Sequence, residues 1–258
     1  LPGTLSGFLT HDDMNIDLRP LAQFAKARLI RATVEDIDLD AKIIRLADRP
    51  EIHFDILSLN IGSQPDASTI LGADEFACPV KPIDKFLTRW ESVLAEAVQR
   101  VSSQKDYAIT MVGGGPASVE LALAMQYRIH TECKLALESE SSLKLSIISS
   151  SSEILARHNT KVRRAALDTL RRRNIKVELG QRVTHFLADS VQTDLGGEYA
   201  CDAAFYATGA SLPKWPVRCG IAMSDDGFID TLPTLQSASH GFVFAAGDAA
   251  TIRGASRT

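Results

Sequence analysis

Hydrophobic positions between residues 107 and 180 follow two alternating patterns. The segment at 107–112 is apolar except for one threonine, the segments at 143–149 and 175–180 interleave apolar with polar residues, and all three have the length of strands. The runs at 116–129 and 160–174 repeat their apolar residues at helical intervals. Strands that alternate with helices in this order predict a parallel sheet with crossover helices.

The segments on either side of residues 107–180 are predicted to contain both helices and strands. The patterns predict helices over 18–27 and 83–101 and strands over 27–32, 33–39, 41–46, 54–65, 200–210 and 240–250. The strand at 54–65 stops at glycine and proline, and the strand at 240–250 ends in Gly-Asp. The basic cluster on the helix at 160–174 is interpreted as a solvated face, with Leu167 and Leu170 on the buried side.

Composition narrows the functional classes. The 258 residues can form one large domain or two ordinary ones. A hydrophobic share of 45% and a net charge of −4 give no reason to expect nucleic acid as a partner. No apolar run approaches the roughly 20 residues that span a bilayer. The chain begins without Met and ends soon after an apolar run, so we expect it to be part of a longer protein.

Cysteine and histidine spacing predicts no metal site. Cys78, Cys133, Cys201 and Cys219 form no CxxC pair, and the six histidines lack ligand spacing such as HxxxH. Few, irregularly spaced cysteines suit a reducing cytoplasm. The two interpretations of the thiols are small buried side chains or one sulfur-handling group.

A glycine turn follows the strand at 107–112. In VGGGPASVE, Gly113, Gly115 and Ser118 occupy the three positions of a G-x-G-x-x-G fingerprint. Gly113 would permit the tight turn, and Gly115 would let a pyrophosphate approach the N–H groups at the helix start. Pro116 suits the first helical position. This strand–turn–helix context predicts dinucleotide binding.

The acid that would grip the ribose of this nucleotide is harder to place. Glu132, Glu138 and Glu140 lie at a suitable distance along the chain but precede the strand at 143–149. At the end of that strand the sequence reads IISSSS, so Ser149 or Ser150 takes the place of the acid. With no carboxylate there and Arg157 nearby, the sequence slightly favours NADPH over NADH, although serines can bind either ribose.

Three further segments carry a family resemblance. The run TLPTLQSASHGFVFAAGDAA resembles the second flavin signature of the pyridine nucleotide-disulphide oxidoreductases, with Gly247 and Asp248 at the flavin position and Thr234 at the upstream Thr. YATGA is similar to the family's return crossing between domains, with Thr208 and Gly209 as expected cofactor-binding residues, and FDILSLNIGSQP is similar to its earlier strand. With the glycine turn, four motifs occur in the family's order.

Within this family the chain resembles the type II NADH dehydrogenase-like branch. LPGTLSGFLTHDDMNIDLRPLAQFA, PVKPIDKFLTRW and ATGASLPKWPVRCGI look like the flavoprotein domain that is fused to, or associated with, selenide, water dikinase. The resemblance implies FAD and NAD(P)H as cofactors and hydride transfer to flavin. The acceptor that follows would be a small molecule, with quinones and sulfur or selenium species as candidates.

The same resemblance implies roles for two charged residues. Glu120 matches a glutamate near the nicotinamide, or is an acid that favours the helix start. Lys81 approaches the flavin, or sits at a domain crossing. The resemblance also implies a cytoplasmic protein that can lie at the inner face of the membrane, and it admits a homodimer; membrane contact and oligomeric state stay open.

The implied fold is α/β, of the two-dinucleotide-binding, glutathione reductase-like type. It has Rossmann-type parallel-sheet domains and a small additional antiparallel β element. Residues 1–100 are assigned to the first part of a FAD-type domain, 101–206 to an inserted NAD(P)-binding domain and 207–258 to the second part. The family's first flavin fingerprint and its dithiol have no counterpart here.

These departures leave two alternatives open. One is a non-catalytic nucleotide-binding or regulatory module associated with the dikinase. The other is sulfide:quinone-type chemistry, for which Cys201 and Cys219 are the nearest thiols downstream.

Overall fold

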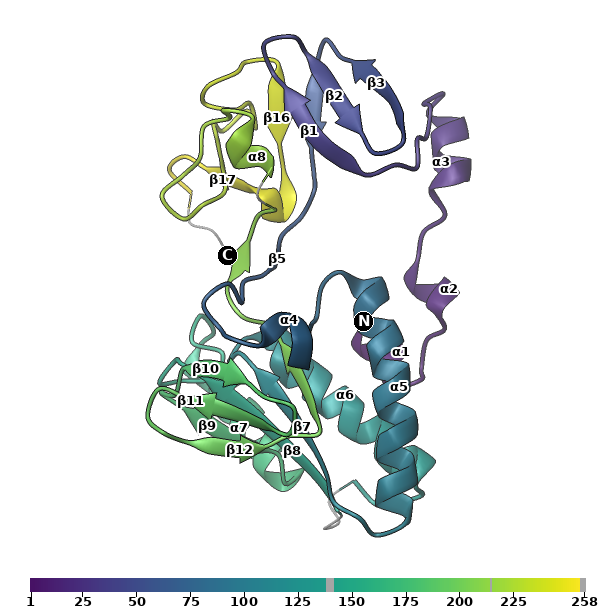
Figure 1. The fold of residues 1–258 in the computed structure, drawn as a ribbon, viewed down its shortest axis with the longest axis vertical. Coiled ribbons are helices and arrows are strands. Elements are labelled where there is room, and N and C mark those ends of the chain that lie inside the picture. The colour runs from purple at the N-terminus through teal and green to yellow at the C-terminus, as the bar shows by residue number, and fades with distance from the viewer. Residues whose placement is uncertain (138–141, 214, 256–258) are drawn as a thin grey trace. The chain divides into compact units, whose positions relative to one another are not determined.

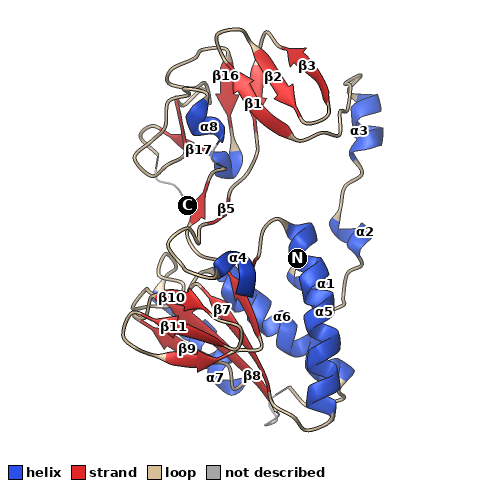
Figure 2. Ribbon diagram, in the orientation of Figure 1, coloured by secondary structure: helices blue, strands red, loops and turns tan. Residues whose placement is uncertain are grey.

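The computed structural model describes residues 1–137, 142–213 and 215–255. The chain folds into two compact units. Unit 1 comprises residues 1–16 and 65–209, and unit 2 comprises residues 17–64 and 210–258. The helices and strands of each unit can be followed by label in Figure 1 and by type in Figure 2.

Unit 1 is built on a five-stranded sheet flanked by helices. Its helices are α1 (Pro2–Leu5), α2 (His11–Met14), α4 (Ala73–Phe76), α5 (Ile83–Ser102), α6 (Pro116–Glu132) and α7 (Thr160–Arg172). Its strands are β6 (Ala77–Pro79), β7 (Tyr107–Val112), β8 (Leu143–Ser149), β9 (Lys176–Leu179), β10 (Val183–Phe186), β11 (Ser190–Thr193), β12 (Glu198–Ala200) and β13 (Ala203–Tyr206).

All five strands of the central sheet run parallel, in the order β6-β13-β7-β8-β9. β7 and β8 coincide with the predicted strands at 107–112 and 143–149, and α6 and α7 follow the predicted helices to within a few residues. β10, β11 and β12 form the additional antiparallel sheet. The predicted α/β class with a parallel Rossmann-type sheet is confirmed.

The two faces of the central sheet serve different cores, because successive side chains of a strand point to opposite sides. Ile109, Ile147 and Phe205 point into a large cluster that also contains the buried faces of α5 and α6. Val112 and Ile148 point the other way and pack with β10 and β11. Strands buried on both faces read as nearly continuous apolar runs, which explains the sequence YAITMV of β7.

Helix α5 shows how the segment before residue 101 joins this sheet. Its buried positions recur every three or four residues, at Phe86, Trp90, Val93, Ala97 and Val101. Residues 65–100 also supply β6 to the sheet edge. This segment therefore packs as part of unit 1. The family resemblance predicts instead that it belongs to the first part of a FAD-type domain, residues 1–100.

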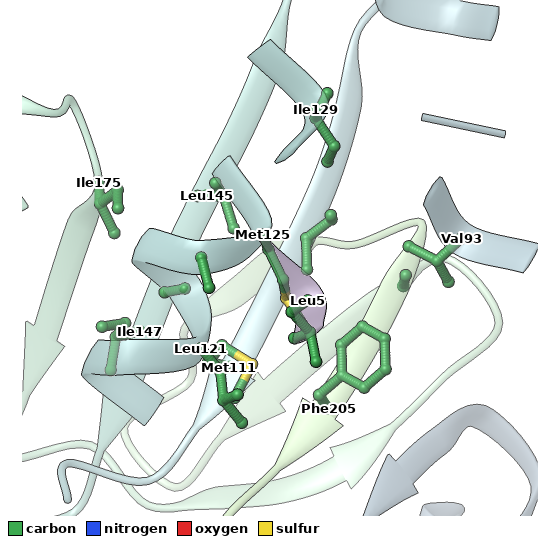
Figure 3. Close-up of a cluster of buried hydrophobic side chains, with 14 of the residues drawn as sticks. Leu5, Val93, Met111, Leu121, Met125, Ile129, Leu145, Ile147, Ile175 and Phe205 are labelled. Carbon is green, nitrogen blue, oxygen red and sulfur yellow. The ribbon is translucent and has the colours of Figure 1, made fainter. Parts of the chain in front are cut away.

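The first residues of the chain also belong to unit 1. Leu5 on α1 is almost fully buried and packs with the core that α6 covers. Figure 3 shows Leu5 beside Met125 within this cluster. Phe8 adds a ring contact to Tyr127, with 5.0 Å between the centroids. The short segment 1–16 is thus held to the sheet unit by apolar packing.

Unit 2 is smaller and built from short elements. They are α3 (Leu18–Phe24), β1 (Val34–Asp38), β2 (Ile43–Leu46), β3 (Arg49–His53), β4 (Leu57–Leu59), α8 (Trp215–Arg218), β15 (Ile229–Thr231), β16 (Val243–Ala245), the 3-10 helix η1 (Gly247–Ala249) and β17 (Ala250–Ile252). β1, β2 and β3 form an antiparallel sheet, and β4 with β16 and β15 with β17 form parallel pairs. β5 (Gln64–Pro65) and β14 (Ala210–Ser211) lie where the chain leaves and re-enters this unit.

One local prediction in unit 2 is correct only in part, and another is wrong. The predicted helix at 18–27 forms and begins at Leu18, but it ends at Phe24, and Lys26 beyond it adopts a positive φ of 52°. The predicted strand at 27–32 does not form, and Leu29 within it remains 49% exposed. Among the described residues, the apolar residues of this segment have no neighbouring strand with which to form hydrogen bonds.

Among the described residues, no helix has both the length and the apolar character needed to cross a bilayer.

Candidate nucleotide-binding site

The turn between β7 and α6 requires glycine at its first position. Gly113 has φ +124°, and a Cβ there would lie 2.4 Å from the carbonyl oxygen of Ala207. Its amide donates to the carbonyl of Ile148 at 2.8 Å, so the turn is tied to the end of β8. Only glycine combines this conformation with this close approach.

The next two glycines differ in what surrounds them. A Cβ on Gly114 would lie 2.5 Å from Ser149 Oγ, so the absence of a side chain allows the turn to pack on β8. A Cβ on Gly115 would meet no atom within 4 Å. Gly115 is the N-cap of α6, with φ −83° and ψ 176°, and has no strain for a methyl group to worsen. Glycine at this position is therefore not needed to avoid a contact inside the protein. It leaves open space in front of the first residues of the helix.

The start of α6 beside that space has groups that could hold a pyrophosphate. The first N–H groups of a helix have no intrahelical acceptor, and the helix dipole favours an anion beside them. α6 has 17 residues, and Pro116 is its exposed first residue. The backbone conformation, the open volume and the helix start together match the phosphate-binding turn of a dinucleotide site.

Ser118 lies on the other side of the turn from this space. It is fully buried, and its Oγ is 3.2 Å from the Cβ position of Gly113. Within the part of the chain that the structure describes, this hydroxyl has no hydrogen-bond partner. A small residue at the third fingerprint position thus allows α6 to pack closely against the turn.

The two serines predicted at the end of β8 have different environments. Ser149 is buried, and its hydroxyl accepts a hydrogen bond from Ser151 N at 3.2 Å beneath the glycine turn. Ser150 is exposed. A ribose approaching from solvent would therefore meet Ser150 before Ser149.

Sequence reasoning missed an acid close to the turn. The carbonyl oxygen of Glu153 is 3.8 Å from the Cβ position of Gly114, and the Glu153 carboxylate forms an ion pair with Arg163 on α7. The signal was present as an acid directly after the serine run, but it lies beyond the strand end where an acid is expected. Glu132 instead pairs with Arg128 at 2.9 Å, and Glu138 and Glu140 lie outside the described residues.

Glu120 and Lys81 are both exposed side chains of unit 1. Glu120 lies one turn into α6 beyond Pro116, and Lys81 lies two residues before the start of α5. Their positions are compatible with contacts to a bound nucleotide, and their roles stay predictions.

Thr208 and Gly209 lie where the chain leaves unit 1. The Thr208 hydroxyl donates to the carbonyl of Asp66 at 2.5 Å, and Asp66 N donates to the carbonyl of Gly209 at 2.8 Å. A hydrogen bond from the Ser68 backbone lowers the pKa of the Asp66 carboxyl. These contacts hold the two ends of segment 65–209 together, which gives both residues a structural role.

In unit 2, two distant predicted motifs meet at the ends of neighbouring parallel strands. β4 is followed by Gly62 and Ser63, and β16 is followed by Gly247 and Asp248. Gly247 has φ +65°, and a Cβ there would lie 2.6 Å from Asn60 Oδ1. Ser63 Oγ donates to Asp248 Oδ2 at 3.4 Å, and Asp248 is exposed.

This strand edge has groups that could hold the sugar and phosphate part of a flavin nucleotide. Ligands of parallel sheets bind beyond the carboxyl ends of the strands, where a carboxylate can accept hydrogen bonds from hydroxyl groups. Thr234 is exposed, and its hydroxyl donates to Gln236 Oε1 at 3.0 Å. Gly247 and Asp248 are therefore the residues of this edge that would hold the flavin nucleotide.

Three of the four cysteines are poorly suited to nucleophilic chemistry. Burial raises the pKa of the Cys78, Cys201 and Cys219 thiols. The thiolate is the reactive form, so a raised pKa reduces reactivity at neutral pH. All four cysteines are free thiols.

A family model described as pyridine nucleotide-disulphide oxidoreductase matches residues 19–257. No curated protein sequence matches the chain. Several solved structures have a similar fold at low sequence identity. NDH2 from Plasmodium falciparum in complex with NADH superposes with a TM-score of 0.79 at 17% identity, over 98% of this chain and 56% of that chain.

Two further structures extend the comparison. The water-forming NADH oxidase from Lactobacillus brevis bound to NADH has a TM-score of 0.75 at 20% identity, over 96% of this chain and 53% of its own. The NAD-dependent persulfide reductase from A. fulgidus has a TM-score of 0.76 at 15% identity, over 96% and 45%. This chain thus spans about half the length of the structures it resembles.

Proposed function

We propose a function for this chain from the premise that it belongs to the pyridine nucleotide-disulphide oxidoreductase family. It forms the nucleotide-binding part of an FAD-dependent NAD(P)H oxidoreductase. In this activity a hydride passes from NAD(P)H to the flavin, and the electrons then pass to a second acceptor. The bound cofactors supply that chemistry, and the protein binds and orients them.

One observation carries the proposal most directly. The backbone at the start of α6 has a conformation suited to a pyrophosphate site, and the space in front of Gly115 is open. Gly113 and Gly114 are required by close contacts inside the protein, whereas Gly115 has no such internal reason to be glycine. A ligand that approaches the backbone at Gly115 explains it.

The flavin assignment rests on the strand edge of unit 2. Gly247 and Asp248 lie beside Gly62 and Ser63, and Asp248 offers an exposed carboxylate to ribityl hydroxyl groups. Glu120 and Lys81 would orient the nicotinamide and the flavin respectively, as the family resemblance implies. Two of the structural neighbours are NADH-bound enzymes, which supports a nicotinamide nucleotide.

The second acceptor is a small molecule, a quinone or a sulfur or selenium species. Thiol chemistry of the sulfide:quinone type is disfavoured at Cys201 and Cys219, because burial raises the pKa of both thiols. Association with selenide, water dikinase, and a regulatory role in that association, rest on the sequence resemblance alone. Homodimer formation, cytoplasmic location and contact with the inner face of the membrane rest on the same ground.

The test is a visible absorption titration of the purified protein with FAD, followed by NADH or NADPH. We expect flavin uptake and bleaching of the flavin bands by a nicotinamide nucleotide. Asp248→Ala should weaken FAD uptake and leave NAD(P)+ binding unchanged, because the two residue sets lie in different units. Uptake of NAD(P)+ without any uptake of FAD would favour the alternative, a nucleotide-binding module without redox activity.

A further inference from the structure

We propose that Arg163 selects NADPH over NADH by exchanging its ion pair with Glu153 for one with the 2′-phosphate. This inference rests on the proposed function, since it concerns the nucleotide that the glycine turn binds. Three properties of the loop between β8 and α7 support it: where the loop is held, which groups it presents and what charge surrounds them.

The loop at 150–159 is attached to the glycine turn. Leu155 N donates to the carbonyl of Gly114 at 2.8 Å, and Ile154 and Leu155 are buried. Ser151 bonds back to the sheet, where its carbonyl accepts from Gly180 N at 2.9 Å. Glu153 therefore projects from a backbone held beside the turn, at the strand end where the adenosine ribose of a dinucleotide lies.

Arg163 reaches this point from the first turns of α7. Its guanidinium donates to the Glu153 carboxylate and, at 3.1 Å, to Thr160 Oγ1. The Arg163 side chain is 20% exposed and that of Glu153 is 57% exposed. The arginine is thus partly buried and oriented, while its acidic partner is the more solvated of the two and the easier to displace. The guanidinium geometry suits bidentate recognition of phosphate as well as of carboxylate.

The charge around this pair favours an additional anion. Residues 150–164 contain one acid, Glu153, against four basic residues, Arg157, Lys161, Arg163 and Arg164, which gives a net charge of 4 − 1 = +3. The strand end itself carries Ser149 and Ser150, so the acid that a 2′-phosphate would meet here is Glu153, whose charge is compensated by Arg163. NADH would leave the Glu153–Arg163 pair intact and gain nothing from Arg163.

The experiment measures NADP+ and NAD+ binding to the purified protein by calorimetry. These oxidised nucleotides differ only in the 2′-phosphate and cannot donate a hydride. We expect the wild-type protein to bind NADP+ at least about tenfold more tightly, equivalent to ~1.4 kcal/mol. Arg163→Gln should remove this preference without changing NAD+ affinity. Glu153→Gln should tighten NADP+ binding, because the arginine no longer has a competing partner.

Two further variants control for charge and folding. Arg171→Gln removes the same charge from the other end of α7, where the arginine lies 3.9 Å from Asp168, and should leave the preference within about twofold of wild type. Arg163→Lys keeps the charge and should retain part of the preference at a lower affinity. Thermal unfolding of each variant shows whether it is folded.

Equal binding of both nucleotides, tighter binding of NAD+, or an equal loss of both in Arg163→Gln would overturn the inference and leave the proposed nucleotide site standing. Binding of neither nucleotide by the wild-type protein would overturn both.

Discussion

Replacing Gly115 by alanine separates binding from folding. The φ and ψ of Gly115, −83° and 176°, are accessible to alanine, and the new methyl group would meet no protein atom within 4 Å. The reduced freedom of the unfolded chain stabilises such a variant by about 0.4–1 kcal/mol. Alanine is a poorer N-cap than glycine, which costs a similar amount. We therefore expect the free energy of unfolding to stay within about 0.5 kcal/mol of wild type.

The same methyl group would occupy the space that a pyrophosphate needs. Loss of close approach to the backbone N–H groups should weaken nucleotide binding at least about a hundredfold, or ~2.7 kcal/mol. Gly114→Ala is the matched control. Its Cβ would lie 2.5 Å from Ser149 Oγ, and such overpacking typically costs about 1–3 kcal/mol of stability.

Urea denaturation and calorimetric titration with NADP+ and NAD+ measure both quantities on each variant. We expect Gly115→Ala to be as stable as wild type and to bind both nucleotides at least about a hundredfold more weakly, and Gly114→Ala to be destabilised. Unchanged nucleotide affinity in Gly115→Ala, with affinity measurable in wild type, would refute the assignment of the open space to the pyrophosphate.

Three other variants test the packing and electrostatics of unit 1. Ser118→Ala removes a buried hydroxyl that has no partner among the described residues, so urea denaturation should show an unchanged free energy of unfolding or a gain of about 1 kcal/mol. Asp202→Ala removes the acceptor of the 2.7 Å bond from Ala108 N and of the 2.8 Å bond from Arg100, and should cost about 1–3 kcal/mol in the same assay. Burial lowers the pKa of His130 in the folded protein, so the unfolded chain takes up this proton first as the pH falls below about 6.5, the ordinary pKa of histidine. The free energy of unfolding should therefore decrease on acidification from that pH. His130→Gln should reduce this dependence of the free energy of unfolding on pH.

The central strands of the sheet were predictable from local pattern. Segment 107–112 is apolar except for one threonine and is buried on both faces, segment 143–149 has apolar residues at four of its seven positions, and the local pattern determined the limits of both. β6 was not predicted, because three residues containing a proline give no periodic signal. Its place at the sheet edge comes from pairing with β13, more than a hundred residues later.

Part of the candidate site was also predictable from the sequence. The fingerprint located the turn, but it could not distinguish Gly114, which is required by Ser149, from Gly115, which faces open space. The Glu153–Arg163 pair was missed because its members lie on different elements, and only the path of the loop over Gly114 brings them beside the turn.

The parallel pairing of β4 with β16 has a consequence for the order in which the protein is made. Leu57 pairs with Val243, so 243 − 57 = 186 residues must be synthesised before this pair can form. At about 5–20 residues per second, the ribosome needs roughly 10–40 s for that length. Segment 65–209 has its own sheet and core and can fold during this interval. β4 cannot form its pair with β16 during this interval, so its two leucines, which are buried in the finished protein, stay uncovered by that strand until residue 243 has been made.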